Sequence, residues 1–143
     1  MEVIRATETY QKAGAYYVRI QAMAKKHHIT LRNEFDEHDN DDTLYIVILD
    51  NDFPIATSRI YPIDADSVMI GRVVVLPEYR HQGIGSLVMK ASEDWARDLG
   101  YKNAVVESRD NKIEFYETLG YKKADEDVIH GVTFDCIRMT KEL

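Results

Sequence analysis

The stretch Val73–Val88, VVVLPEYRHQGIGSLV, decides which fold the chain can adopt. It starts with three β-branched residues, which favour a buried strand, breaks at Pro77 and continues in a pattern that suits a helix. The hexapeptide RHQGIG lies between the two, so two glycines remove side chains from the backbone where the helix begins. The unpaired N–H groups of a first helical turn, with the positive end of the helix dipole and Arg80 nearby, suit a phosphate or diphosphate.

Two common phosphate loops do not fit this stretch. A dinucleotide fingerprint needs a small residue where this chain has Val88, and a nucleotide P-loop needs a GK[ST] sequence that does not follow here. The pattern that fits is R-x-x-G-x-G preceded by V-x-V-x-P-x-Y, which resembles the coenzyme-A-binding core of the GNAT superfamily of N-acetyltransferases. The segment VVESRDNKIEFYETLGY, residues 105–121, is similar to the second half of that core. The alternative is that the glycines only shape a loop and Tyr116 is only a core aromatic.

The resemblance implies an α/β fold, α+β in stricter usage, with helices on both faces of a mixed, mostly antiparallel sheet. Two central parallel strands splay apart beyond the glycine loop, and pantetheine lies in the wedge between them. We expect a single GNAT domain over residues 1–143. The expected strands cover residues 2–6, 44–50, 54–62, 67–76, 103–108, 121–128 and 132–139. Three helices are expected: one begins after a cap at Thr7, one follows Gly85 and buries Leu99, and one covers residues 111–119. Residues 27–42 are expected to form a short helix or a loop.

Composition limits the classes of protein. A chain of 143 residues with 45% hydrophobic and 30% charged residues is typical of one soluble globular domain. The net charge of −7 disfavours nucleic acid as a partner and favours cationic partners. Because neither a signal peptide nor an apolar run of membrane-spanning length is seen, we expect a cytoplasmic protein that does not contact membranes. Cys136 is the only cysteine, either a catalytic thiol or, as we favour, a small apolar residue in a strand.

Acetyl-CoA is the co-substrate that the resemblance implies, with no metal. It implies backbone contacts to the pantetheine arm at Val73, Val74 and Val75, and a hydrogen bond to the same arm from Asn111. It implies that the diphosphate contacts Arg80, His81, Gln82, Gly83, Ile84 and Gly85. Most of these contacts use backbone amides, so we expect the glycines to matter more than the neighbouring side chains.

Acetyl transfer to an amine needs a base for the acceptor ammonium and a proton donor for the departing thiolate. The resemblance places Tyr116, in FYETLGY, where the family has its proton donor; the alternative is a tyrosine that only packs against pantetheine. Many members carry the base just before the apolar triplet, where this chain has Gly71 and then Arg72. Glu107 matches the position of the base in ribosomal-protein alanine acetyltransferases and is the first candidate. Glu34 is the second.

The acidic segment RNEFDEHDNDD, residues 32–42, allows three interpretations. It is a solvated connection, which we favour, or it recognises the ammonium of the acceptor, with Glu34 and Arg72 as the expected acceptor-binding residues. The third interpretation is a metal site, although the residue order of a calcium loop is missing. Together with Val18 and Arg19, this segment resembles the small bacterial ElaA-like branch of the superfamily.

Two functions are consistent with these features. The first is an enzyme that moves the acetyl group of acetyl-CoA to a primary amine by direct attack in a ternary complex. The second is a catalytically weak or inactive acyl-CoA-binding sensor or scaffold, which the missing glutamate at Gly71 makes conceivable. The expected acceptor is a small-molecule amine, or the N-terminus or a lysine of a protein. Many members of the superfamily are homodimers, and the sequence is compatible with one.

Overall fold

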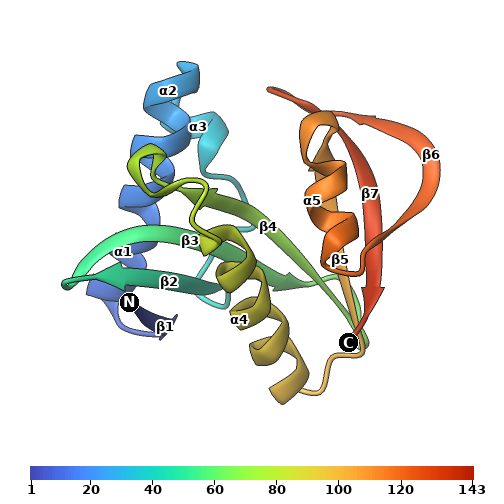
Figure 1. Cartoon of the computed structure of the whole chain (residues 1–143), viewed down its shortest axis with the longest axis horizontal. Coiled ribbons are helices and arrows are strands. Elements are labelled where there is room, and N and C mark those ends of the chain that lie inside the picture. Colours follow the sequence, from blue (N-terminus) through green and yellow to red (C-terminus); the bar gives the residue numbers. More distant parts are fainter.

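The sheet has seven strands in the order β1-β2-β3-β4-β5-β7-β6, and only β4 and β5 pair in parallel (Figure 1). This computed structural model describes residues 1–143 apart from the side chain of Glu126. The strands are β1 (Glu2–Ala6), β2 (Leu44–Asp50), β3 (Phe53–Pro62), β4 (Ser67–Val75), β5 (Asn103–Arg109), β6 (Lys122–His130) and β7 (Asp135–Glu142). The expected mixed sheet with a parallel pair at its centre is confirmed.

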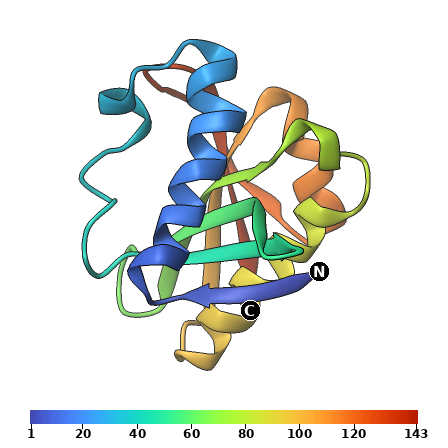
Figure 2. The same cartoon turned by 90° about the vertical axis from the view of Figure 1, so that its left-hand side faces the viewer.

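The helices lie on both faces of the sheet, with α1 on one face and α4 and α5 on the other (Figures 1 and 2). They are α1 (Thr9–Arg19), α2 (Lys25–His27), α3 (Leu31–Glu34), α4 (Ile84–Asp98) and α5 (Ile113–Thr118). A π-helical turn, Ile20–Ala24, joins α1 to α2, so that they form one continuous rod in Figure 2. Within the described part of the chain, no helix is long and apolar enough to cross a membrane.

Alternation along β2 builds the core on both faces of the sheet. Tyr45 and Val47 are buried with Ala15 of α1, whereas Ile46 and Ile48 belong to the larger core that includes Val88 of α4. Successive side chains of a strand point to opposite faces, so a fully apolar strand can be covered by helices on each side. The continuous apolar run of β2 therefore reflects its place inside the fold rather than at an edge.

The start of α1 differs from the expected one. The side chain of Gln11 accepts hydrogen bonds from the backbone N–H groups of Thr7 and Glu8, at 2.9 Å each. Glu8 and Gln11 together form a capping box, which satisfies N–H groups that a helix start leaves free. The prediction of Thr7 as the cap is wrong because Glu8 occupies that position.

Two other boundaries differ from the expected ones. Leu99 follows the end of α4 and is 53% exposed, so the expectation that it is buried is wrong. The last hairpin has a wider turn than expected, in which the N–H of Gly131 donates to the carbonyl of Phe134 at 3.1 Å. Strand β7 therefore begins at Asp135 rather than at Val132.

Candidate active site

The central parallel strands separate along their length. Pairing between β4 and β5 covers only Ser67–Met69 against Asn103–Val105. Beyond that, β4 keeps β3 as its partner through Val75, and β5 keeps β7 through Arg109, so each strand loses its inner neighbour (Figure 1). Strands that diverge leave inward-facing backbone groups that need partners. A wedge of this kind suits an extended ligand rich in amides, which can pair with the strand edge.

A β-bulge in β4 lies where the strands separate. Arg59 pairs with Gly71 and Thr57 pairs with Val74, so two residues of β4 lie opposite one residue of β3. Arg72, inside the bulge, has φ +49, in the left-handed region. A bulge of this type bends its strand and re-aims the backbone. At Gly71, where many GNAT members have a glutamate, a Cβ would meet nothing within 4 Å, so this place is open.

The glycine loop connects the end of β4 to α4. A 3-10 turn, Pro77–Tyr79, follows β4, and Gly83 forms the N-cap of α4 with φ +78. A Cβ on Gly83 would meet no atom within 4 Å, so the space above the helix start is open. The first turn of an α-helix leaves its N–H groups without partners in the helix, and the dipole adds positive potential there. A loop of this kind is suited to bind an anion through its backbone amides.

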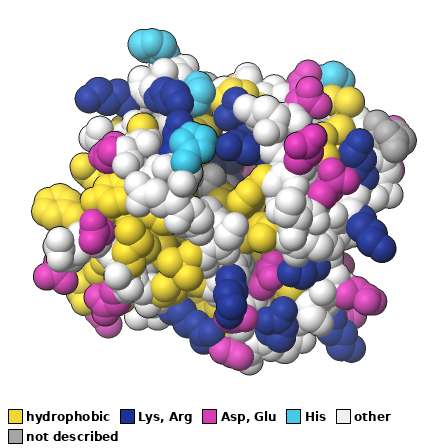
Figure 3. All heavy atoms as spheres, in the orientation of Figure 1, with side chains coloured by type: hydrophobic (Ala, Val, Ile, Leu, Met, Phe, Trp, Pro, Cys, Tyr) yellow, Lys and Arg dark blue, Asp and Glu magenta, His cyan; other side chains and the backbone are white. Residues whose placement is uncertain are grey.

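The side chains of the loop leave that space clear. Arg80 turns back and its Nε donates to the carbonyl of Val75 at 3.3 Å. Gln82 donates to the carbonyl of Glu78 at 3.4 Å, and His81 is exposed with φ +63. In Figure 3 the surface is hollowed between this part of the molecule and α5, and Lys or Arg side chains line the hollow.

Gly85 serves a different purpose from Gly83. Its φ does not lie in the left-handed region, but a Cβ there would lie 3.4 Å from Cζ of Phe115 in α5. Gly85 therefore allows α4 and α5 to approach each other closely. Because α5 also carries Tyr116, this contact helps to fix the position of that phenol relative to the loop.

Tyr116 is held in an apolar environment with its hydroxyl unused. The residue is 9% exposed, and its ring packs edge-on against those of Phe115 and Tyr121. Burial, and next the nearby Cys136, raise the pKa of Tyr116 to about 12. Its hydroxyl makes no hydrogen bond with any residue in the described part of the chain, whereas the hydroxyl of Tyr121 donates to Glu93 at 2.8 Å. A phenol with this pKa stays protonated at neutral pH and can donate to a ligand.

Asn111 lies where β5 passes into α5. It sits in a 3-10 turn, Asp110–Lys112, and is exposed. The turn follows the end of β5 directly, beyond the stretch in which β5 pairs with β4.

Glu107 lies on the face of β5 opposite to the core. Its neighbour Val106 is buried in the core with Met139, and alternation directs Glu107 to the other face. Arg138, its cross-strand partner on β7, approaches the carboxylate at 3.4 Å, and the Glu107 side chain is 37% exposed. A carboxylate in this position is accessible to an incoming ligand.

The face around Glu107 also holds residues that the sequence analysis did not assign to the site. Arg109 and Cys136 pair across β5 and β7, two residues along from the pair of Glu107 and Arg138. The pKa of the Cys136 thiol is raised by burial and then by the charge of Glu107, which does not favour a nucleophilic thiolate. Period-two alternation from Glu107 would have placed Arg109 on this face. We call Glu107, Arg109, Cys136 and Arg138 the β5–β7 face.

Comparison with known proteins decides the family. Residues 6–121 match the acetyltransferase (GNAT) family. The chain belongs to the GNAT family. It is therefore an acyltransferase, and it is 27% identical over 142 residues to an uncharacterized N-acetyltransferase of Bacillus subtilis, YjcF, a match that covers 99% of this chain and 100% of YjcF.

Solved structures agree with this GNAT assignment. A crystal structure assigned to the N-acetyltransferases, from Lactobacillus plantarum, superposes with a TM-score of 0.92 at 28% identity, covering 99% of this chain and 97% of that one. Escherichia coli ElaA has the same fold, with a TM-score of 0.86 at 20% identity over 99% of this chain and 100% of that one. A GNAT acetyltransferase from Elizabethkingia anophelis, solved with acetyl-CoA bound, has a TM-score of 0.73 at 18% identity, with 99% and 97% covered.

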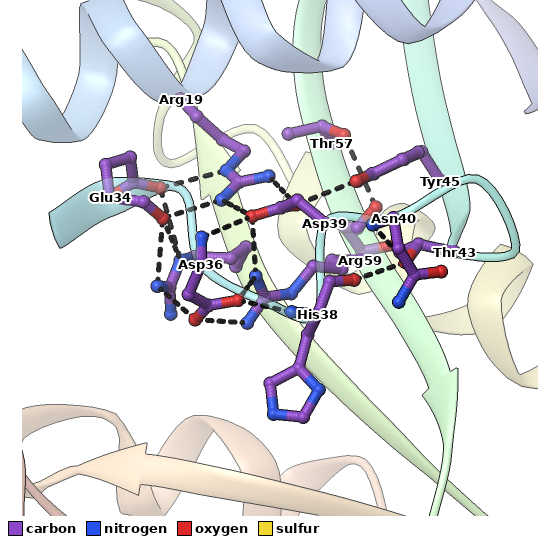
Figure 4. Close-up of polar contacts among 12 residues, drawn as sticks. Arg19, Glu34, Asp36, His38, Asp39, Asn40, Thr43, Tyr45, Thr57 and Arg59 are labelled. Carbon is purple, nitrogen blue, oxygen red and sulfur yellow. Dashed lines mark hydrogen bonds and ion pairs between the residues drawn. The ribbon is translucent and has the colours of Figure 1, made fainter. Parts of the chain in front are cut away.

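A network of ion pairs holds the acidic segment against the sheet of this GNAT domain (Figure 4). Arg19 is fully buried; its Nε donates to Glu34 at 2.9 Å and its Nη1 donates to Asp39 at 2.6 Å. Asp39 also accepts hydrogen bonds from the Tyr45 hydroxyl at 2.7 Å and from Arg59 at 2.9 Å. Desolvation raises the pKa of Asp39, but the hydrogen bonds from Arg19 and Tyr45 and the arginine charges outweigh it and hold the pKa well below its usual range.

The network reaches the bulge in β4. Arg72 donates to the backbone carbonyl of Glu34 at 3.0 Å, and its guanidinium lies 3.2 Å from the Glu34 carboxylate and 3.3 Å from Asp36. Arg59 also binds Asp36, at 2.8 Å. These contacts tie the strained backbone at Arg72 to the segment after α3. The network therefore fixes the point at which β4 turns away from β5.

The interpretation of the acidic segment as a solvated connection is wrong for its paired carboxylates, Glu34, Asp36 and Asp39, whereas Glu37, Asp41 and Asp42 are exposed. Glu34 is 3% exposed and Asp39 is nearly as buried, because three arginines from distant elements neutralise them. Within the described residues, no group of three or more His, Cys, Asp or Glu side chains is arranged to hold a metal ion. The Glu34 carboxylate is already bound by Arg19 and Arg72, which makes it a poorer candidate for the base than Glu107.

Proposed function

We propose that this chain, as a single domain, transfers the acetyl group of acetyl-CoA to a primary amine by direct attack in a ternary complex. The observation that supports this most strongly is the glycine loop, with its open helix start, at the mouth of the splayed strands β4 and β5. The family membership and the E. anophelis relative, which binds acetyl-CoA, are in accord with it. When bound, acetyl-CoA supplies an acyl group already activated as a thioester.

The coenzyme is held by backbone groups in this proposal. The amides of the loop from Arg80 to Gly85 bind the diphosphate, and the free edge of Val73–Val75 binds the amides of the pantetheine arm. Asn111 binds that arm from the side of β5. Because the contacts come from the backbone, the strands and the helix start position the thioester without large side-chain movements.

Glu107 is the proposed base. An alkyl ammonium has a pKa of about 10.4, so most of the acceptor is charged at neutral pH and cannot attack a carbonyl. The Glu107 carboxylate lies on the accessible β5–β7 face, where it can accept the ammonium proton directly or through one water. The new C–N bond then forms as the C–S bond breaks, and the second proton that the nitrogen loses replaces, through water, the proton that the sulfur takes.

Tyr116 is the proposed donor to the departing sulfur. Its pKa of about 12 keeps the phenol protonated throughout the neutral range, so a hydrogen-bond donor is always present. A parent thiol has a pKa of about 8.5, and the apolar wedge disfavours a thiolate as it disfavours a phenolate. Tyr116 therefore stabilises the developing negative charge by its hydrogen bond and delivers the proton to the sulfur. Glu107 and Tyr116 approach the wedge from opposite faces of the sheet.

Release of free thiol from acetyl-CoA, measured with a panel of primary amines, tests the function. We expect turnover in the wild type and a loss of about 10²-fold or more in kcat for both Glu107→Gln and Tyr116→Phe. Glu117→Gln, an exposed carboxylate on α5, is the matched control and should keep wild-type rates. Tight acetyl-CoA binding without turnover for any amine would contradict the enzyme proposal and favour the sensor or scaffold, in line with the absent glutamate at Gly71.

A further inference from the structure

We propose that the acceptor is a small amine that carries a carboxylate, and that Arg109 and Arg138 bind this carboxylate beside Glu107. The inference rests on the proposed amine acetyltransferase function and names its substrate class. Among the arginines near the wedge, Arg109 differs from the others in its partners, and this difference is where the inference begins.

Arg109 has no anionic partner in the described part of the chain. Its guanidinium lies 3.7 Å from the centre of the Phe134 ring, and it makes no hydrogen bond or ion pair with any described residue. Arg19, Arg59 and Arg72 are each paired with carboxylates. A guanidinium presents five N–H donors in a planar fork that matches a carboxylate. Stacking on an aromatic ring leaves the edge of that fork free for such a ligand.

Arg138 is only loosely committed. Its distance to Glu107 is 3.4 Å, and both side chains are partly exposed, at 49% and 37%. An exposed ion pair of this geometry contributes little to stability. An acceptor ammonium that approaches Glu107 can therefore take over the carboxylate and release the guanidinium of Arg138 for the carboxylate of the same ligand.

The register of β5 and β7 brings these groups together. Glu107 pairs with Arg138, and Arg109 pairs with Cys136 two residues further along the strands, on the same face. Residues that pair directly have Cβ atoms about 5 Å apart, and diagonal neighbours are still within reach of long side chains. One carboxylate between two guanidinium groups is complementary to a ligand with one ammonium and one carboxylate. The carboxylate of Asp135, next along β7, is bound to His130 at 3.1 Å.

The far end of the face is bounded by aromatic contacts. Phe134, in the turn between β6 and β7, meets His27 of α2 with ring centroids 5.3 Å apart. The pKa of His27 is lowered by desolvation and then by the charge of Arg109, so the imidazole is less readily protonated and competes less with the arginines for the anion. This contact joins the hairpin to the helix beside Arg109, which favours a small ligand over an extended chain.

Steady-state kinetics on matched pairs of acceptors tests the inference. Each of the twenty amino acids is compared with its primary amide, which keeps the amine and removes the carboxylate. We expect at least one amino acid to be turned over with kcat/KM about 10-fold or more above that of its amide. Arg109→Gln and Arg138→Gln should each raise KM for the amino acid about 10-fold with little change in kcat, and should change KM for the amide by a much smaller factor. Arg97→Gln, on the exposed side of α4, is the control.

The outcomes separate the inference from the function on which it rests. If amines are acetylated but the amides have kcat/KM values equal to or above those of the amino acids, the carboxylate inference is overturned and the transferase function stands. The same holds if neither arginine variant changes KM for the amino acid. Turnover of no amine at all overturns both. Circular dichroism and thermal unfolding of both arginine variants verify that they fold.

Discussion

The glycine loop, residues 80–85, and the acidic segment, residues 32–42, serve the site in opposite ways. The loop is mostly exposed, and its value lies in side chains that are absent, since Gly83 leaves open space at a helix start. The acidic segment holds two buried carboxylates, Glu34 and Asp39, and its value lies in charges that three arginines neutralise. In the proposed function the first region binds the coenzyme, whereas the second holds β4, the strand that leads into the loop.

The largest expected effect comes from the acidic segment. Arg19→Met would leave Glu34 and Asp39 as buried carboxylates without their main partner, which typically costs about 3–5 kcal/mol in the free energy of unfolding. Urea unfolding measures this. Arg97→Met, which removes an exposed ion pair with Asp94, should change stability by no more than about 0.5 kcal/mol. Equal, small losses for both would show that the network does not hold the segment.

This contrast also explains how much the sequence could reveal. The loop is contiguous, so the strand, the turn and the helix around it were predicted from local pattern, and the family resemblance predicted a mostly antiparallel sheet with a central parallel pair. The acidic segment finds its partners on α1, β3 and β4, 15 to 38 positions away in the chain. No local pattern reports such pairs, so a run of carboxylates was interpreted as exposed although it is paired.

The site shows the same division. Glu107 and Tyr116 were singled out through motifs; the structure places Glu107 on β5 and Tyr116 on α5, and their catalytic roles stay predictions. The β-bulge at Arg72 and the π-helical turn leave no local sequence signal, because both depend on packing between elements. Arg109 could have been found, since strand periodicity puts it on the face of Glu107.

The next largest effect is expected in the loop. Gly83→Val puts a β-branched residue at φ +78 and fills the space above the helix start, so acetyl-CoA affinity should fall by about 100-fold or more. Gly100→Val, at the other end of α4, is a matched control with φ +92 and equally open space. Both should lose roughly 1–2 kcal/mol of stability from backbone strain. Calorimetric titration with acetyl-CoA measures the affinity of both variants. If Gly83→Val bound acetyl-CoA as tightly as Gly100→Val, the glycine loop would not be the coenzyme site.

Two buried tyrosines sharpen the distinction between a site residue and a structural one. Tyr116→Phe should lower kcat about 10²-fold with little loss of stability, since its hydroxyl bonds no described residue. Tyr121→Phe should keep kcat and lose roughly 1–3 kcal/mol of stability, because Glu93 then lacks a buried donor. Kinetics and thermal unfolding on the same preparations check this. If Tyr121→Phe lost activity and Tyr116→Phe kept it, Tyr116 would not be the proton donor.

The smallest expected effect is a pH dependence. The folded-state pKa of Asp39 lies below its unfolded value of about 3.9, so its stabilisation is present above that pH and is lost as the pH falls. Between pH 7 and pH 3.5 this one group should account for about 0.7 kcal/mol of lost stability. Asp39→Asn should be less stable than the wild type at pH 7, and its free energy of unfolding should fall less between pH 7 and pH 3.5. Identical pH dependence in the two proteins would mean that Asp39 does not titrate as the network requires.

A crystal structure of the chain with acetyl-CoA bound tests the central claim most directly. The diphosphate should lie within hydrogen-bond distance of backbone N–H groups between Arg80 and Gly85, with the pantetheine arm along Val73–Val75 and the thioester sulfur next to the Tyr116 hydroxyl. Coenzyme bound at another surface, with the space above Gly83 empty, would contradict the account.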